Sequence, residues 1–292
     1  MAEPIGIFAP SSAFDPDRFA AGLDVLRVLG FEPVVPDAVY ARHGYLAGTD
    51  ATRLASLNQL LDRDDVPTLM AARGGYGVHR LLGQLDYARL ARRTVVGFSD
   101  LTALHLALWA RTGAAFVHGP VVTQLVDLPD ADRVALANRI RNPDRLETLY
   151  GAADPAPPDP AGPVEGVLMG GCLALVAALV GTPFARFPDR TILLLEEVAE
   201  PPYRVDRMLT QLELAGVPER VVGVALGALT RCDAPRPDEP DGRDAALERL
   251  RAWGVAVITD LPIGHGTRNH AVPLGRMARL DPRAGTLEVG RR

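Results

Sequence analysis

Short apolar runs alternate with segments of helical periodicity along residues 5–96, and this alternation constrains the fold more than any other feature. The apolar runs predict strands at 5–9, 31–35, 68–71 and 94–96, and the periodic segments predict helices at 16–29, 51–61 and 78–85. Strands that alternate with helices form βαβ units with parallel strands. We therefore predict an α/β fold, in which residues 1–126 form an N-terminal domain on a doubly wound, mostly parallel sheet.

The character of the sequence changes over residues 127–164, which include a proline-rich run at 153–163. Proline at this density can neither extend a helix nor join a central strand, so we interpret 127–164 as an interdomain connector. Residues 165–292 then mix apolar strands, amphipathic helices and irregular loops. They predict a smaller C-terminal domain that is mixed α+β and rich in β-structure.

Composition excludes several classes of function. The 292 residues carry a net charge of −5 with no basic stripe, so nothing indicates a nucleic-acid partner. The chain contains no lysine, which rules out a lysine Schiff base, and its two cysteines, Cys172 and Cys232, lack the spacing of a zinc site or a disulfide framework. Without a signal-peptide pattern or an apolar run of about 18 residues, we expect a cytoplasmic protein that does not enter a membrane.

The run Gly-Phe-Ser-Asp at 97–100 joins the predicted strand 94–96 to the apolar-periodic segment 101–109, so Ser99 lies on a strand-to-helix corner. Such a turn exposes a hydroxyl, and the first N–H groups of the helix are free donors that can stabilise an oxyanion. The motif is half of a Gly-x-Ser-x-Gly elbow, because Leu101 takes the second glycine position. The tetrapeptide alone also fits a helix that Ser99 or Asp100 simply caps.

A serine nucleophile needs a neighbouring base. His265 is the best candidate among the six histidines, because it follows a predicted strand and flanking glycines allow another domain to approach closely. His118, at the end of another predicted strand, is a reserve candidate. A catalytic imidazole also needs an acceptor for its second nitrogen.

The apolar strand 191–195 ends in two carboxylates that can supply this acceptor. Strand side chains alternate between faces, so Glu196 can face the crevice while Glu197 faces solvent. A strand end that is merely solvated on both faces is the alternative interpretation.

Five blocks of sequence resemble successive signatures of the L,D-carboxypeptidase family, which includes muramoyltetrapeptide carboxypeptidases and microcin C immunity peptidases. In chain order the blocks are 39–50, 72–77 (Ala-Arg-Gly-Gly-Tyr-Gly), 97–100, 195–197 with 202–209, and 262–266 (Pro-Ile-Gly-His-Gly). The resemblance implies that Ser99 is the nucleophile, that Glu196 orients the base and that His265 is the base. It also implies a homodimer in the cytoplasm.

The expected reaction is amide hydrolysis through an acyl-enzyme, with no metal and no organic cofactor. We expect the backbone N–H groups of Asp100 and Gly75 to hold the oxyanion. Arg73, with Gly74 and Tyr76, is a candidate for binding the small peptide substrate, because a guanidinium binds a terminal carboxylate bidentately. Arg73 can equally brace its loop by donating to carbonyl groups.

The substrate that the resemblance implies is a muropeptide that loses its terminal D-alanine during peptidoglycan recycling; a peptide-nucleotide antibiotic of the microcin C type is the alternative. Cys172 stands where the family segment Gly-Gly-Asn-Leu has asparagine, so a hydrogen bond near the site can be absent and the preferred substrate stays open. A nucleophilic Cys172 is a further alternative. In another class, the loop 73–77 could cradle an anion in a non-catalytic nucleotide-binding module, although it lacks the Gly-x-Gly-x-x-Gly fingerprint.

Overall fold

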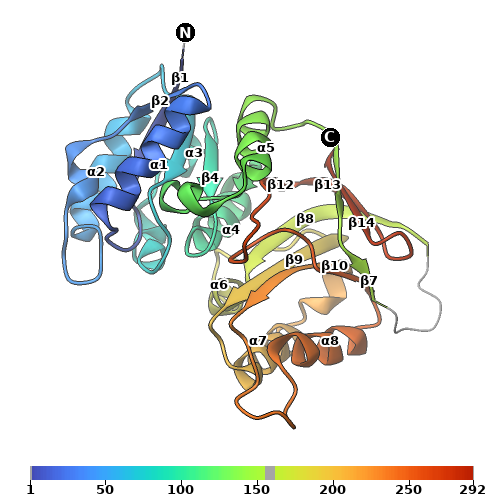
Figure 1. Ribbon diagram of the computed structural model, residues 1–292. Coiled ribbons are helices and arrows are strands. Elements are labelled where there is room, and N and C mark those ends of the chain that lie inside the picture. Colours follow the sequence, from blue (N-terminus) through green and yellow to red (C-terminus); the bar gives the residue numbers. More distant parts are fainter. Residues whose placement is uncertain (1, 155–161, 292) are drawn as a thin grey trace.

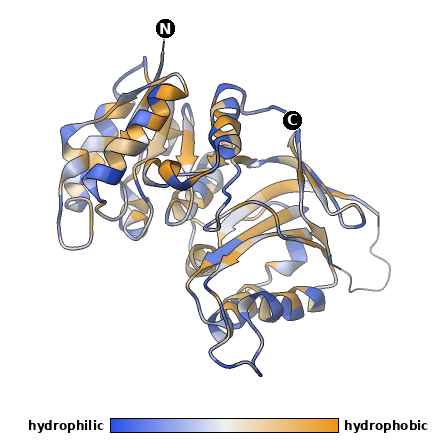
Figure 2. Ribbon diagram, in the orientation of Figure 1, coloured by the Kyte–Doolittle hydropathy of each residue, from blue (hydrophilic) through white to orange (hydrophobic). Residues whose placement is uncertain are grey.

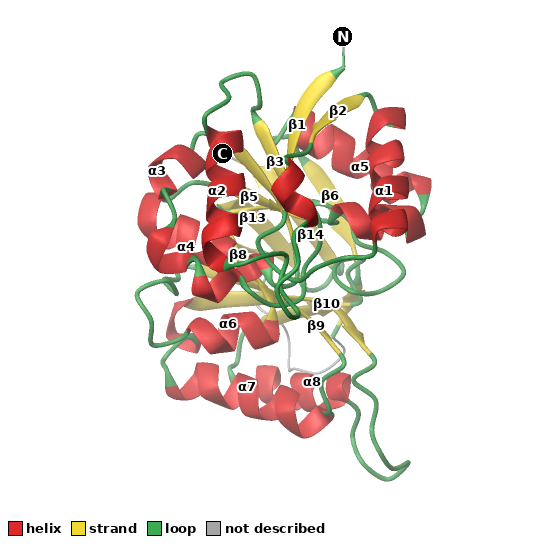
Figure 3. Ribbon diagram, turned by 90° about the vertical axis from the view of Figure 1, so that its left-hand side faces the viewer, coloured by secondary structure: helices red, strands yellow, loops and turns green. Residues whose placement is uncertain are grey.

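The structure is a computed structural model that describes residues 2–154 and 162–291, so residues 155–161 of the predicted connector lie outside the described residues. Within the described ranges the chain folds into two β-sheets with helices packed on them (Figures 1 and 3). No described helix combines the length and the apolar character needed to cross a membrane.

The first sheet confirms the predicted doubly wound arrangement. Its strand order is β12-β5-β4-β3-β1-β2, and its strands β1 to β5 all run parallel to one another. These strands are β1 (Glu3–Phe8), β2 (Phe31–Val34), β3 (Thr68–Ala71), β4 (Thr94–Gly97) and β5 (Phe116–His118). The exception is the edge strand β12 (Val272–Leu274), which returns from late in the chain and pairs antiparallel with β5.

The helices of this half are α1 (Pro16–Val28), α2 (Asp50–Leu61), the single turn α3 (Tyr87–Leu90) and α4 (Leu101–Thr112). The helix predicted at 78–85 is wrong in type, since it consists of two short 3₁₀ segments, Val78–Arg80 and Leu82–Gln84. Two local features account for the difference. Gly83 disfavours a continuous helix, and the N–H of Val78 donates to the side chain of Asp100.

The second sheet is mixed and confirms the predicted β-rich C-terminal half. Its order is β6-β14-β13-β8-β9-β10-β11-β7, in which β8 to β11 run parallel and the outer strands antiparallel. The strands are β6 (Glu147–Tyr150), β7 (Ala152–Ala153), β8 (Val164–Cys172), β9 (Thr191–Val198), β10 (Val221–Thr230), β11 (Ala256–Thr259), β13 (Arg276–Asp281) and β14 (Thr286–Arg291). Its helices are α6 (Leu173–Leu179), α7 (Pro202–Leu214) and α8 (Gly242–Ala252), and Figure 1 shows α7 and α8 side by side along one face.

The segment between the two halves is structured where it is described. It carries the helix α5 (Asp130–Arg141), whose apolar residues pack with α1 into the core of the first sheet, and the strands β6 and β7, which lie at the two edges of the second sheet. The chain therefore crosses between the sheets more than once. The domain limits 1–126, 127–164 and 165–292 stay a prediction.

A continuous apolar core joins the two sheets across α4 and α6. It includes Phe98 and Leu101 from the first half and Met169, Leu173 and Leu194 from the second, all of them buried. Figure 2 shows that strands in both halves are predominantly hydrophobic. Burial of this kind stabilises by about 25 cal/mol per Å² of apolar surface, so it holds the corner at the end of β4 firmly against the second sheet.

Candidate active site

Ser99 lies in the sharp turn between β4 and α4, as predicted. Its φ is +62°, a left-handed conformation that is uncommon for a residue with a side chain. Strain of this kind in a strand-to-helix turn is characteristic of an exposed nucleophile. Asp100 occupies the cap position of α4 but makes no side-chain capping bond, so simple helix capping does not account for the motif.

The glycine-rich loop after β3 lies directly against this turn. A β-carbon at Gly74 would come within 2.9 Å of the Cβ and 3.0 Å of the Oγ of Ser99, so only glycine leaves the hydroxyl accessible here. A β-carbon at Gly75 would overlap the side chain of Ser12. The N–H groups of Gly75 and Asp100 have no acceptor in residues 2–154 and 162–291, which leaves both available to an oxyanion.

Three loops are tied together by residues that sequence analysis did not single out. The hydroxyl of Ser11 donates to Asp100 Oδ2 (2.7 Å), and the N–H of Val78 donates to the same oxygen (2.9 Å). Ser12 accepts a hydrogen bond from the N–H of Tyr76 (3.1 Å). Burial raises the pKa of the Asp100 carboxyl, and the hydrogen bonds from Ser11 and Val78 oppose this rise. The position of two serines in the loop after β1, at the same end of the parallel strands as Ser99, is the sequence signal that could have found them.

Of the three substrate-binding candidates in this loop, Arg73 and Tyr76 are exposed and Gly74 is buried. Arg73 donates through Nη1 to the carbonyl of Ala13, which is the bracing role that its sequence left open. The ring of Tyr76 packs edge to face against that of Tyr45, with 5.8 Å between the ring centroids. Both rings face solvent beside the glycine loop, so they can contact a bound molecule.

Glu196 and His265 meet as predicted, although 69 residues separate them. The imidazole Nδ1 lies 2.6 Å from Oε2 of the carboxylate, which is fully buried near the end of β9. Because a carboxylate only accepts, Nδ1 carries the proton and Nε2 is left free as an acceptor in the neutral ring. Burial lowers the pKa of His265, but the hydrogen bond to Glu196 and the charges of Glu196 and Glu197 outweigh it, so the pKa is raised.

The imidazole also contacts the turn that carries the serine. The ring of Phe98, the residue before Ser99, lies with its centroid 4.6 Å from that of His265. The structure thus brings the predicted base, its acid partner and the strained turn together at one place between the two sheets.

The loop that carries His265 is anchored to the other half of the molecule by residues that sequence analysis missed. The side chain of Asn269 accepts from the N–H of Gly264 (3.0 Å) and donates to Gln124 (2.8 Å). Arg268 makes two hydrogen bonds of 2.7 Å to Asp132, which is fully buried on α5. No local pattern marks these residues, because their partners lie far away in the sequence.

The prediction that Glu197 faces solvent is wrong. Alternation does turn it away from Glu196, but α6 covers that face of the sheet and leaves Glu197 only 2% exposed. Its carboxylate accepts from the N–H of Ala174 (2.6 Å), in the first turn of α6, and from the thiol of Cys172 (3.4 Å). Burial raises the pKa of the Cys172 thiol well above its usual value, and the side chain is buried, so neither feature suits a nucleophile.

His118, the reserve base, is fully buried at the end of β5. Burial lowers its pKa to about 4, and neither ring nitrogen has a hydrogen-bond partner among the described residues. Its ring packs edge to face on Phe98, with 6.0 Å between the centroids. An imidazole without an orienting acceptor is less suited to take a proton than His265.

Two family models match the halves of the chain. Residues 5–119 match the LD-carboxypeptidase N-terminal domain, and residues 165–280 match the LD-carboxypeptidase C-terminal domain. The murein tetrapeptide carboxypeptidase of Pseudomonas aeruginosa is 36% identical over 291 residues, which cover 95% of this chain and 92% of that protein. The chain belongs to the LD-carboxypeptidase family.

Solved structures of this peptidase family share the fold. The muramoyltetrapeptide carboxypeptidase from Oxalobacter formigenes matches with a TM-score of 0.87 at 30% identity and covers 98% of each chain. The microcin C7 self-immunity protein of Escherichia coli is 24% identical over 96% of this chain and 91% of that protein. Its wild-type structure matches with a TM-score of 0.85 at 22% identity, covering 100% of this chain and 96% of that chain.

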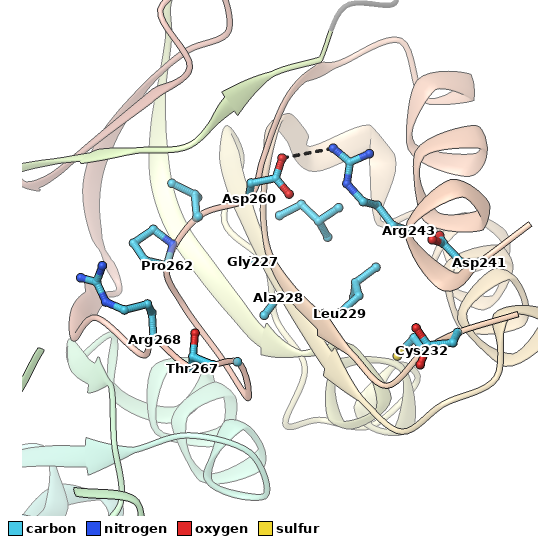
Figure 4. A pocket seen from close by; sticks show the side chains of 14 residues that line it. Gly227, Ala228, Leu229, Cys232, Asp241, Arg243, Asp260, Pro262, Thr267 and Arg268 are labelled. Atoms are coloured by element: carbon cyan, nitrogen blue, oxygen red, sulfur yellow. Dashed lines mark hydrogen bonds and ion pairs between the residues drawn. The ribbon is translucent and has the colours of Figure 1, made fainter. Parts of the chain in front are cut away.

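A cavity of about 410 Å³ opens beside the loop that follows His265 (Figure 4). Gly266, Thr267 and Arg268 line one side of it, and Arg243 of α8 lies across from them next to Asp260. The guanidinium of Arg243 is 3.2 Å from the Asp260 carboxylate. Both arginines of this cavity therefore already have a carboxylate partner.

Proposed function

We propose that this protein is a serine carboxypeptidase that removes a terminal D-amino acid from a cytoplasmic muropeptide through an acyl-enzyme. The observation that carries the proposal is the 2.6 Å contact between His265 and the buried Glu196, on a loop that packs against the residue before Ser99. A buried carboxylate that fixes the imidazole tautomer is what a serine nucleophile requires.

In the first step Nε2 of His265 takes the proton of the Ser99 hydroxyl, and the oxygen attacks the scissile carbonyl. The carbonyl carbon becomes tetrahedral, and its negative oxygen accepts hydrogen bonds from the N–H groups of Gly75 and Asp100. These donors are free in the described chain and belong to loops that are tied together, so they are oriented before the substrate arrives. One such donor lowers the barrier by roughly 2.7–4 kcal/mol.

Collapse of this intermediate breaks the amide bond, and the protonated His265 gives its proton to the leaving amine. The acyl group stays on Ser99 as an ester. Water then loses a proton to the same imidazole, attacks the ester and releases the acyl product with the serine hydroxyl restored. The charge of Glu196 stabilises the imidazolium in both halves of the reaction.

The assignment of a muropeptide substrate is supported by relatives that are named as murein peptide carboxypeptidases. One of them is the Pseudomonas aeruginosa protein, which is 36% identical. The Escherichia coli immunity protein, at 24% identity, makes a peptide-nucleotide antibiotic the second candidate. Removal of a terminal D-alanine in the cytoplasm fits peptidoglycan recycling, in which imported fragments are shortened before reuse. We expect the protein to act there as a homodimer.

The test is to incubate the purified protein with a muramyl tetrapeptide and to follow the release of D-alanine by mass spectrometry. We expect release by the wild type, near-complete loss with Ser99→Ala or His265→Ala, and an unchanged rate with Ser56→Ala, which changes a serine on α2. Turnover by Ser99→Ala would refute the mechanism. An inert wild type that cleaves an aminoacyl-sulfamoyl adenosine would instead refute the muropeptide assignment.

A further inference from the structure

A carboxypeptidase must recognise a free carboxylate, and in a chain without lysine the fixed cations available for this are arginines. Three arginines of the loops around the candidate residues already have partners. Arg73 donates to the carbonyl of Ala13, Arg268 is bound to Asp132, and Arg243 pairs with Asp260 (Figure 4). The charges of Arg268 and Arg243 are already met by carboxylates. Arg73 has no carboxylate partner, but its hydrogen bond to Ala13 ties it to its own loop, and the test below includes it.

Arg231 differs from these arginines. It directly follows β10, whose residue Thr230 pairs with Val198 of β9. Arg231 therefore emerges at the carboxyl ends of these parallel strands, where Glu196 also lies. Its side chain is exposed, and within residues 2–154 and 162–291 it takes part in no hydrogen bond and no ion pair. The guanidinium is therefore free to meet an anion from outside.

The backbone at Arg231 is strained. Its φ is +55°, in the left-handed region. This conformation is unfavourable for a residue that has a β-carbon and is not unfavourable for glycine. The preceding carbonyl, of Thr230, accepts from the N–H of Ala199 (2.9 Å), so the turn is held in place by the neighbouring strand end. A large charged side chain at a strained position beside a candidate site is the kind of feature that indicates a functional requirement.

The charge of Arg231 also reaches the base. Besides burial, it acts to lower the pKa of His265, against the effect of Glu196. An unpaired positive charge near an imidazole that must become positive opposes the reaction, unless an anion of the substrate neutralises it first.

We propose that Arg231 binds the terminal carboxylate of the peptide substrate. This inference rests on the proposed function. In such a substrate the carboxylate is attached through one carbon to the leaving nitrogen, and that nitrogen receives its proton from His265. The carboxylate receptor must therefore lie on the His265 side of the serine, where Arg231 emerges, and it restricts the enzyme to peptides with a free C-terminal carboxylate.

The test compares kcat/KM for a muramyl tetrapeptide and for its C-terminal amide. The variants are Arg231→Gly, which removes the cation and relieves the strained backbone, Arg73→Ala, and Arg207→Ala as a control on α7, where the guanidinium of Arg207 lies over the ring of Tyr203. We expect the ratio of acid to amide hydrolysis to fall by about 30-fold or more in Arg231→Gly and to stay unchanged in the control. The melting temperature of Arg231→Gly should equal or exceed that of the wild type.

A ratio that Arg231→Gly leaves intact, or one that falls in Arg73→Ala instead, would overturn the proposal. A second readout separates it from the proposed reaction. In the Ser99→Ala background, NMR titration should show that the tetrapeptide raises the pKa of His265, and that adding Arg231→Gly abolishes this effect. If the wild type does not release D-alanine but this effect is present, the reaction is wrong and the carboxylate site stands; if the effect is absent, the carboxylate site is wrong.

Discussion

Gly264 and Glu196 are packed so closely that no β-carbon fits between them. An atom added at Gly264 would lie 2.6 Å from Oε2 and 2.8 Å from Cβ of Glu196. The residue also has a φ of +111°, which side-chain-bearing residues rarely adopt. Because Gly264 precedes His265, this contact fixes the acid and the imidazole relative to each other.

We therefore expect Gly264→Ala to displace the carboxylate from the imidazole. A displacement of about 1 Å in such a site costs roughly 100-fold in kcat/KM, and the added strain should lower the free energy of unfolding by about 1–3 kcal/mol. Gly254→Ala is the matched control, since Gly254 has a φ of +69° with nothing within 4 Å of an added β-carbon. It should lose stability by about 1 kcal/mol and keep its activity; equal kinetics in the two variants would show that the contact does not matter.

The raised pKa of His265 predicts the pH dependence. The base must be neutral to take the serine proton, so kcat/KM should fall as the pH drops through a midpoint above the usual histidine value. Glu196→Gln removes the interactions that favour the imidazolium, so it should move this midpoint to lower pH and reduce kcat by roughly 10²–10⁴-fold. Glu213→Gln, on α7, is the control. An acid limb that stays in place in Glu196→Gln would argue against His265 as the base.

Asp100 should act by holding the loops around Ser99 rather than by ionising. Asp100→Ala leaves the hydroxyl of Ser11 and the N–H of Val78 without their acceptor, which should cost about 1–3 kcal/mol of stability and reduce kcat. Asp100→Asn keeps an acceptor oxygen and should restore most of both. Denaturant unfolding and steady-state kinetics check this, and equal loss in the two variants would show that the negative charge itself is required.

Local pattern predicted the first sheet because its strands and helices are encoded by the period of their own apolar residues. The same signal is too short for β7 and β12, which have two and three residues and exist as strands only through partners far along the chain. Helix α5 was missed because the composition of the surrounding segment suggested a connector. Its apolar residues are few, and they are recognisable as a core face only once α1 is seen against them.

The candidate site divides in the same way. Ser99, Glu196 and His265 each follow an apolar strand, so the topology of a parallel sheet indicated that they could meet. The supporting contacts of Ser11 and Asp132 join segments 89 and more than 130 residues apart, and no spacing rule reports them. Glu197 was assigned to solvent because alternation tells which face a side chain takes, but not whether a helix covers that face.

Cys172 should be dispensable for the chemistry. Its thiol is buried and donates to Glu197, so Cys172→Ala removes one weak hydrogen bond and a small apolar volume. We expect kcat to change by less than about threefold and stability to fall by about 1 kcal/mol. Treatment of the native protein with iodoacetamide should likewise leave the activity intact. Loss of the acyl-enzyme in Cys172→Ala, detected by mass spectrometry, would make the thiol the nucleophile.

The pair of Arg268 and Asp132 is predicted to hold the His265 loop in its active position. Asp132 is fully buried and binds Arg268 through two hydrogen bonds of 2.7 Å and the N–H of Asn269 at 3.2 Å, so removing it leaves several donors without a partner. Arg268 is about half exposed, which weakens the ionic part through solvent screening. We expect Asp132→Ala to cost about 1–3 kcal/mol of stability and roughly tenfold in kcat.

Asp189→Ala provides the comparison, because Asp189 pairs with Arg220 on the surface and its loss should cost less than about 1 kcal/mol with no kinetic effect. A double-mutant cycle with Arg268→Ala separates the pair from the rest of the loop. If Asp132→Ala and the double variant lose the same activity, the pair acts as a unit that positions His265. If Asp132→Ala unfolds at a lower temperature but turns over substrate at the wild-type rate, the loop keeps its position without this contact and Asn269 alone is sufficient.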